Sequence, residues 1–302
     1  MKYNFNTEKV TNGVIDWIRE WFAVNGSNCK AVIGISGGKD STVAAKLCVE
    51  ALGNERVYGV LMPNGDQHDL GIAIEIAEYL GIEYCVINIE NMFDDVINSL
   101  TNELKSVTEQ TRINIAPRLR MLVLRGVCQS VNGRMVNTSN LSEDWVGYCT
   151  IDGDAAGDFS PLSYLTASEV KNIGTYLNIP DEYVNKTPED GLTGVSDEVK
   201  FGFTYDDLDG YIRGYRLISR DSENKIVKKF NQNRFKLDAT IGLKKYKPNV
   251  DYLYTHDESK FDGIFEEISY LKKYQRSLLP PSLKSDPRNP FDLNNNISKI
   301  DE

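Results

Sequence analysis

A glycine-rich loop stands between a short apolar run and a helical pattern near the start of the chain. The run is AVIGI (31–35), the loop is SGGKDS (36–41), and apolar residues then recur at helical spacing up to Gly53. Strand, glycine loop and helix in this order form a phosphate site, because the loop amides and the helix N-terminus present donors and partial positive charge to an anion. The sequence therefore predicts an anion-binding turn on an α/β scaffold.

The neighbouring segments repeat this alternation of strand and helix. Strands are expected at 57–61, 84–89 and 134–138, and helices at 10–22, 71–80 and 113–128. Such alternation predicts an α/β fold, with a parallel sheet, right-handed crossovers and flanking helices. Thr166 and Glu169 form a capping box before a further helix.

The second half of the chain holds a long polar loop and a separate C-terminal part. The segment GYCTIDGDAAGDFSP (147–161) is too polar for a core and too long for a simple connection, so we expect a functional loop. Beyond about residue 240, Lys, Tyr, Asp and Asn dominate, with one further helical pattern at 264–271. We expect residues 1–240 to form the main domain and 241–302 a C-terminal extension that packs on it and ends in a polar tail.

Charge and composition exclude several classes of protein. The chain carries 34 Lys and Arg against 44 Asp and Glu, a net charge of −10. This balance argues against DNA or RNA as a partner, because non-specific nucleic-acid affinity comes from basic side chains that neutralise phosphates. No apolar run approaches the ~20 residues of a membrane span, and the N-terminus lacks the apolar core of a signal peptide, so a cytoplasmic protein is expected. Five widely spaced cysteines and two histidines do not predict a zinc site or disulfide framework.

The loop differs from two common phosphate motifs. Lys39 is followed by Asp40, where a Walker A loop has Ser or Thr, and the glycines are not spaced as G-x-G-x-x-G. The segment instead resembles the SGGxDS loop of the ATP pyrophosphatases, which cleave ATP between the α and β phosphates and pass AMP to an acceptor. This resemblance implies the fold of the adenine nucleotide alpha hydrolases.

Within that group, the chain resembles the ammonia-dependent NAD synthetases over about residues 1–240. Further blocks follow in the family's order: NIAPRLRM (114–121), NTSNLSE (137–143), GYCTIDGDAAGDFSPL (147–162) and DEVKFGFTYDDLD (197–209). No glutaminase domain precedes the loop, so the resemblance implies ammonia as the nitrogen donor. Members of the family are homodimers, and the apolar helix at 10–22 is a candidate for such an interface.

The resemblance implies a role for individual residues. ATP contacts are implied for Gly34, Ser36, Gly37, Gly38, Asp40, Ser41, Met62 and Thr138. Contacts to deamido-NAD are implied for Asn114, Arg118, Asp158 and Lys236. Asp40 and Glu143 are the implied ligands of Mg²⁺.

The implied reaction is the ATP-dependent amidation of deamido-NAD to NAD, AMP and pyrophosphate. A carboxylate is a poor electrophile, so the nicotinate carboxylate first attacks the ATP α-phosphorus, expels pyrophosphate and forms an NAD-adenylate. Loop amides would hold the leaving group, while Mg²⁺ on Asp40 and Glu143 offsets the phosphate charge. Ammonia then displaces AMP. Because only neutral ammonia is nucleophilic, Asp158 or another loop carboxylate is expected to take a proton from ammonium.

Four positions depart from the family's pattern. Ile151 and Ala167 replace lysines, Glu189 replaces Ser or Thr, and Phe235 replaces His. These changes remove positive charge from the usual anion contacts and leave affinity and substrate identity open. Lys39, at the variable position of the loop, is a candidate ATP contact that restores part of this charge. The alternative for Lys39 is a solvated side chain at a helix start.

Two other functions stay open on the sequence alone. One is another SGGxDS-loop adenylating ligase with a different acceptor, and the other is a nucleotide-binding relative without turnover. Arg120 and Arg125 share the helix with Arg118, and either surface ion pairing or ligand contact fits them.

Overall fold

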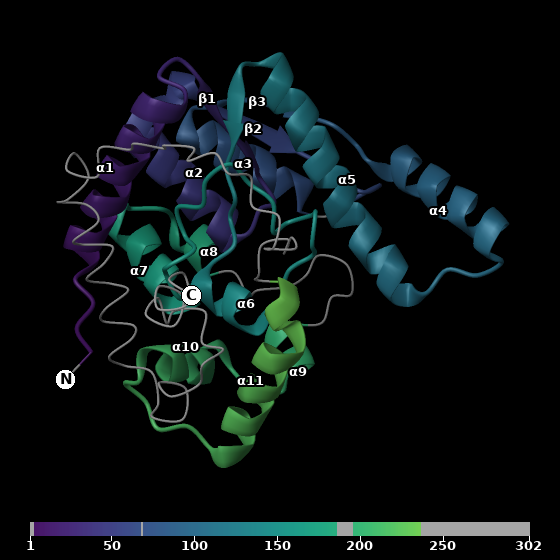
Figure 1. Cartoon of the computed structure of the whole chain (residues 1–302). Helices are drawn as coiled ribbons and strands as arrows, with labels where there is room; N and C mark the ends of the chain where they lie inside the picture. The colour runs from purple at the N-terminus through teal and green to yellow at the C-terminus, as the bar shows by residue number, and fades with distance from the viewer. Residues whose placement is uncertain (1–2, 68, 186–195, 237–302) are drawn as a thin grey trace, which may run out of the picture.

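The computed structural model describes residues 3–67, 69–185 and 196–236, which are built around a parallel sheet with helices on both faces (Figure 1). The strands are β1 (Lys30–Gly34), β2 (Val57–Leu61), β3 (Glu83–Val86) and β4 (Gly133–Met135). The helices are α1 (Thr7–Asn25), α2 (Lys39–Leu52), α3 (Leu70–Leu80), α4 (Glu90–Leu104), α5 (Glu109–Ser130), α6 (Leu141–Val146), α7 (Ala167–Tyr176), α8 (Asp181–Val184), α9 (Asp197–Phe201), α10 (Tyr205–Arg213) and α11 (Arg220–Asn233). Short 3-10 turns occur at η1 (Asn54–Arg56) and η2 (Arg234–Lys236).

The strands of the sheet run parallel in the order β3–β2–β1–β4. Ala31 of β1 pairs with Val57 of β2 and with Arg134 of β4, so β1 is bonded on both edges. A parallel bridge between Val136 and Phe159 continues the pairing beyond β4. Because the strands point the same way, their carboxyl ends and the loops that follow meet at one edge of the sheet.

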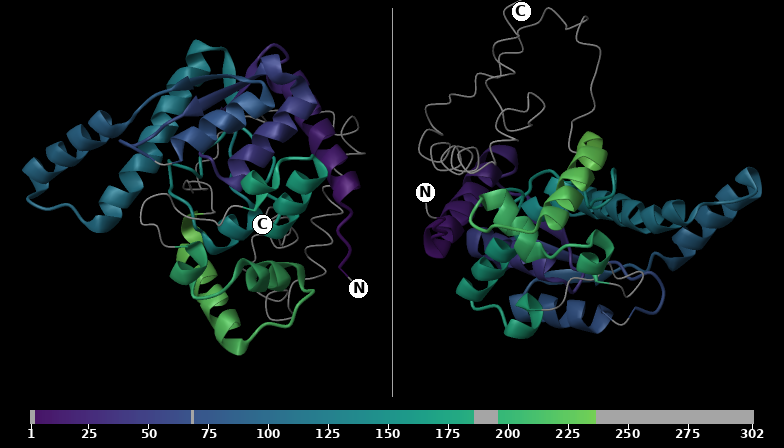
Figure 2. Two further views of the ribbon diagram at one scale, coloured as in Figure 1. Left: turned by 180° about the vertical axis from the view of Figure 1, so that it is seen from behind. Right: turned by 90° about the horizontal axis from the view of Figure 1, so that it is seen from below.

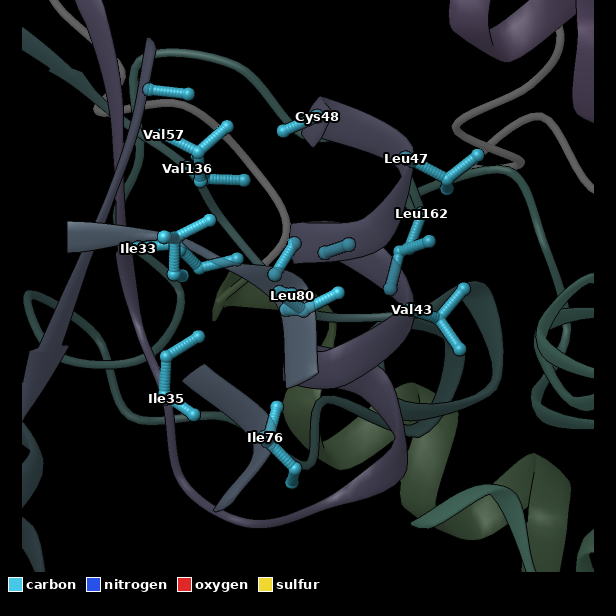
Figure 3. Close-up of a cluster of buried hydrophobic side chains, with 14 of the residues drawn as sticks. Ile33, Ile35, Val43, Leu47, Cys48, Val57, Ile76, Leu80, Val136 and Leu162 are labelled. Carbon is cyan, nitrogen blue, oxygen red and sulfur yellow. The ribbon is translucent and has the colours of Figure 1, made fainter. Parts of the chain in front are cut away.

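Both faces of the sheet are buried, which explains the apolar runs in its central strands. Ile33 packs into a core formed with α1, α2, α3 and α7, and Figure 3 shows this cluster around Leu47 and Ile76. The preceding residue of β1, Val32, points to the opposite face of the sheet, where it packs with Met135 and Cys128 under α5. A strand covered on both sides has no polar face, so its sequence is apolar throughout.

Helix α4 and the N-terminal part of α5 project beyond the sheet (Figures 1 and 2). Ile97 is the buried residue of α4, while Leu104 at its end is 62% exposed. On α5, Leu122 is 61% exposed. The end of α4 in this projecting part therefore presents Leu104 at the surface.

A second core lies among α6, α9, α10 and α11, below the sheet in Figure 1. Its buried apolar side chains include Trp145, Phe201, Leu208 and Phe230. Ala167, the first residue of α7, also belongs to it and joins this core to the layer that packs on the sheet.

The fold class expected from the sequence is confirmed. The strand expected at 57–61 is β2, whereas the strands expected at 84–89 and 134–138 end earlier, at Val86 and Met135. Helix α4 is not among the helices expected from the sequence, although Phe93, Val96 and Ile97 recur at helical spacing; Phe93 and Val96 pack toward α5, and Ile97 is buried. None of the described helices is long and apolar enough to cross a membrane.

The apolar stripe of α1 belongs to the core. Ile18 and Phe22 are buried against α2 and α7, and Trp21 stacks on Phe159 from the end of the polar loop. Val14, Trp17 and Trp21 are only partly buried, so the dimer interface that the sequence suggested for this helix stays a prediction. The extension at 241–302 and its helical pattern lie outside the described residues, and the domain boundary stays a prediction.

A buried ion pair joins α7 to α10. Arg213 donates to Glu169 from Nε at 2.7 Å and from a terminal guanidinium nitrogen at 2.5 Å, and both side chains are at most 3% exposed. The Tyr3 hydroxyl donates to the same carboxylate at 2.6 Å, and its ring stacks on Tyr215. These contacts attach the N-terminal segment to both cores.

Replacing Arg213 with Met should lower the free energy of unfolding by about 3–5 kcal/mol, because Glu169 is then buried without its partner charge. Arg216→Met is the matched control: Arg216 is half exposed, and its pairs with Asp206 and Asp207 are 3.5 Å long. Its effect should stay below about 1 kcal/mol. Urea unfolding followed by circular dichroism measures both, and equal effects would contradict the importance of the buried pair.

Candidate active site

A cavity of about 610 Å³ lies where the carboxyl ends of β1 and β2 meet the first turn of α2. Parts of α5, α9, α11 and the polar loop complete its wall. Ligand sites in parallel α/β sheets occur at this place, outside the carboxyl ends of the strands.

Bonds among its own residues shape the SGGKDS loop. Ser41 Oγ donates to the Gly38 carbonyl at 3.0 Å, and the Gly38 amide donates to Ser36 Oγ at 3.3 Å. Gly37 has a φ of +79°, and a Cβ there would lie 3.3 Å from the Asp69 carbonyl oxygen, so glycine is required. Helix α2 begins after Gly38 without a side-chain cap among the described residues. Its first-turn amides are therefore suited to bind an anion in the cavity.

Asn140 brings the Asp40 and Glu143 carboxylates together at the cavity wall. Its side-chain amide donates to Asp40 Oδ1 at 3.1 Å, and its backbone amide donates to Glu143 Oε2 at 3.2 Å. Its side-chain oxygen also accepts from the Glu143 amide at 3.0 Å, which completes a capping box at the start of α6. A single residue thus orients both carboxylates.

Lys39 offsets part of the negative charge of this pair. Its Nζ lies 2.6 Å from Asp40 Oδ1, and its side chain is 9% exposed. Burial and the Asp40 carboxylate raise the pKa of Glu143 well above its usual range, and attraction to Lys39 opposes this shift. The wall therefore favours binding of further positive charge.

The two carboxylates suit a hard divalent cation. Mg²⁺ commonly takes one or two protein carboxylates and fills its remaining positions with water and substrate phosphate oxygens. Among the residues that the structure describes, no group of three or more His, Cys, Asp or Glu side chains is arranged around a metal position. Asp40 and Glu143 thus fit an ion that is shared with a phosphate ligand.

Another part of the wall carries two cations and a carboxylate. Arg120 lines the cavity and donates from Nε to a backbone carbonyl after β2 at 3.1 Å. Asp154 accepts from the Thr150 amide at 2.8 Å, and burial raises the pKa of its carboxyl. Lys236 lines the cavity and donates from Nζ to two backbone carbonyls of the polar loop, at 2.9 and 3.1 Å.

Most of the residues selected from the sequence line this one cavity. They are Gly34, Ser36, Gly38, Lys39, Asp40, Ser41, Met62, Asn114, Thr138, Glu143 and Lys236. They come from five separate parts of the chain, and only the fold brings them together. Gly37 shapes the loop without being part of the lining.

Arg118 and Asp158 lie outside the cavity lining. Arg118 is exposed and donates from Nε to the Ile151 carbonyl at 3.1 Å. Asp158 is ion-paired with Arg125, and its other oxygen accepts from the Met135 amide at 2.7 Å. These bonds attach the polar loop to α5 and β4. The roles of both residues toward deamido-NAD stay predictions.

Among the polar residues to which the sequence assigned no role, Arg120 and Asp154 line the cavity, and Asn140 bonds to the Asp40 and Glu143 carboxylates. Arg120 is two positions from Arg118, so the two side chains leave the helix in different directions, and Arg120 points inward. Asn140 has a readable signal, because an Asn three residues before a Glu is typical of a capping box. Asp154 has no such signal, since the polar loop contains several acidic residues.

The four departures from the family's pattern fall in different environments. Ala167 is buried in the second core. Ile151 and Phe235 are 37% and 64% exposed, and neither lines the cavity. Glu189 lies outside the described residues. In the described part of the chain, the cationic side chains of the lining are Lys39, Arg120, Lys229 and Lys236.

Comparison with known proteins identifies the group to which this chain belongs. The family model described as NAD synthase matches residues 10–247. The chain is a member of the NAD synthase family. A curated NH(3)-dependent NAD(+) synthetase of Thermococcus sibiricus is 41% identical over 212 residues, covering 70% of this chain and 81% of the relative. One of Archaeoglobus fulgidus is 36% identical over 212 residues, covering 69% and 84%.

Solved structures of NAD synthase relatives share the fold. NMN synthetase from Francisella tularensis superposes with a TM-score of 0.73 at 29% identity, covering 80% of this chain and all of that one. The NH3-dependent NAD synthetase from Campylobacter jejuni superposes with a TM-score of 0.67 at 28% identity, covering 79% of this chain and 100% of the other. The family resemblance drawn from the sequence is confirmed, and this chain is a ligase of an ATP-using family.

Burial of Asp144, beside Glu143 on α6, should make the free energy of unfolding depend on pH. Burial, with a contribution from Asp154, raises the pKa of Asp144 to about 6. A carboxyl whose pKa is raised in the folded state supports folding while protonated. That support is complete below about pH 4 and is lost as the pH rises through about 6.

Asp144→Asn should therefore raise the free energy of unfolding at pH 7.5 by up to about 3 kcal/mol and leave it nearly unchanged at pH 4. Urea unfolding at both pH values measures the effect. Asp16→Asn is the control, because the Asp16 side chain is 61% exposed. An equal gain at both pH values would contradict the assignment.

Proposed function

We propose that this chain uses ATP and ammonia to amidate deamido-NAD through an NAD-adenylate, releasing NAD, AMP and pyrophosphate. The observation that carries the proposal is one cavity that contains the SGGKDS loop, the Asp40–Glu143 pair and Arg120. The two curated relatives are NH(3)-dependent NAD(+) synthetases, and the matched region covers 81% and 84% of their lengths.

At the nucleotide end of the cavity, loop amides and the first turn of α2 bind phosphate oxygens and the leaving pyrophosphate. Mg²⁺, when held by Asp40 and Glu143, supplies neutralisation of the phosphate charge. Asn140 keeps the two carboxylates oriented through the bonds described above. Lys39 adds a positive charge on the same side as the phosphates.

At the acceptor end, Arg120 and Lys236 offer positive charge to the anionic dinucleotide. We assign to Asp154 the role of accepting a proton from ammonium, because this carboxylate lines the cavity and that of Asp158 does not. Burial raises the pKa of Asp154, which makes its carboxylate a better proton acceptor than an exposed one. Burial also limits water, which would otherwise compete with ammonia for the adenylate.

The proposal is tested by incubating the full chain with ATP, Mg²⁺, ammonium and deamido-NAD and identifying the products. Equal amounts of NAD, AMP and pyrophosphate are expected. AMP released only with another acceptor would instead indicate a different adenylating ligase. ATP binding without turnover would indicate a relative that has lost catalysis.

The match to NMN synthetase favours a second acceptor, the mononucleotide acid that would yield NMN. That structure is covered over its full length. In this chain, Ile151 also stands where the family resemblance implies a lysine contact to the dinucleotide. The ratio of kcat/KM for the two acid substrates in direct competition decides between them.

We further propose a homodimer, as the family resemblance implies. Val14, Trp17 and Trp21 of α1 are only partly buried, so this helix remains the candidate interface. Sedimentation velocity should give twice the monomer mass, and a monomer at micromolar concentration would contradict the proposal.

Asp154→Asn should lower kcat/KM for ammonium by about 10²–10⁴-fold, because general-base catalysis has this magnitude, while the KM for ATP changes little. Asp158→Asn is the matched control, with the same substitution in the same loop but outside the cavity lining. Its kcat/KM for ammonium should fall less than the Asp154 variant's. A larger loss in the Asp158 variant would return the proton-acceptor role to Asp158.

A further inference from the structure

The variable position of the phosphate loop holds a lysine that contacts Asp40, one of the two carboxylates assigned to the metal. Lys39 Nζ lies 2.6 Å from Asp40 Oδ1, and only 9% of the side chain is exposed. The same ammonium attracts Glu143. Lys39 is therefore not a solvated side chain at the start of a helix, which was one of its two expected states.

The oxygen of Asp40 that faces this lysine already has two donors. Lys39 Nζ and the Asn140 side-chain amide, at 3.1 Å, both bind Oδ1. A divalent cation that approaches this oxygen meets a positive charge at bonding distance. Because like charges repel strongly in a half-buried wall, the cation and the ammonium cannot both keep this position.

Lysine has the flexibility that such an exchange requires. Its charge sits at the end of a four-carbon stem, so Nζ can leave Asp40 without any change in the helix backbone. Lys39 lines the same cavity as the loop amides of Gly38 and Ser41, where phosphate oxygens are expected. A triphosphate bound there offers the displaced ammonium a new anionic partner.

We propose that Lys39 is the resident counter-ion of the Asp40–Glu143 pair: its ammonium holds the cation position in the ligand-free protein and moves to a phosphate oxygen when the metal and ATP bind. The identities of metal and nucleotide rest on the proposed function. The consequence is cooperative binding: the metal alone has to displace a bonded charge, whereas the metal with ATP gives that charge a new partner.

The experiment compares Lys39→Met with the wild-type full-length chain in two binding measurements that need no turnover. In the first, Mn²⁺ alone is titrated and free Mn²⁺ is read by electron paramagnetic resonance. The variant should bind Mn²⁺ about tenfold more tightly, because the competing charge is gone. In the second, Mg²⁺ with α,β-methylene-ATP is titrated by calorimetry. Here the variant should bind several-fold more weakly.

Two further variants separate charge from packing. Lys39→Arg retains a positive charge and should bind Mn²⁺ with the weak wild-type affinity. Lys46→Met removes a lysine from the same helix, where it pairs with Glu50 at 2.7 Å outside the cavity lining, and should match the wild type in both titrations. Thermal melting identifies any variant that fails to fold, and Lys39→Gln then takes the place of Lys39→Met.

Opposite shifts in the two titrations support the proposal, since a purely structural lysine would move both in the same direction. Unchanged or weaker binding of Mn²⁺ alone by Lys39→Met would overturn it. Unchanged or tighter binding of the nucleotide complex would overturn the transfer of the ammonium to phosphate. If Mn²⁺ binding tightens in a chain that makes no NAD, the counter-ion role stands and the proposed function fails.

Discussion

Repulsion between two neighbouring carboxylates sets the conditions for the rest of the cavity. Asp40 comes from the first turn of α2 and Glu143 from the first turn of α6, and both are fixed by bonds to Asn140. Partial burial strengthens their repulsion and equally strengthens their attraction for any cation. The buried ammonium of Lys39 offsets part of this negative charge, and the uncapped amides at the start of α2 offer a nearby site for an anion that arrives with a cation. A site of this kind suits ligands that combine a cation with an anion.

The scaffold brings these charges together through the direction of its strands. Parallel strands deliver the loop after β1, the end of β2 and the segment after β4 to a common edge. The second core then supplies a wall from α9 and α11, with Asp197 held by the Tyr148 hydroxyl at 2.9 Å. The cavity therefore lies between two separately packed bodies, and its width depends on how they are joined.

The sequence was a good guide to the sheet and to the phosphate loop, because both depend on local patterns. The run around Ile33 and the turn at Gly37 are determined by burial and backbone conformation close to their own position. Arg118 and Asp158 were selected by position in a motif, and motif position does not say which way a side chain points. Arg120 faces the cavity because of the way α5 is rotated about its axis against the sheet, and this rotation is known only from the packed structure. The bond from Asn140 to Asp40, which brings Glu143 beside Asp40, likewise depends on how α6 packs, since Asn140 is 100 residues from Asp40.

The contacts of Tyr3 and Arg213 with the Glu169 carboxylate also bear on the cavity. Through this carboxylate on α7, the first described residues of the chain are bonded to the same group as Arg213 of α10. Helix α7 packs in the sheet core and α10 in the second core, so this carboxylate joins the two layers that border the cavity. Residues outside the cavity lining thus connect the two halves of its wall.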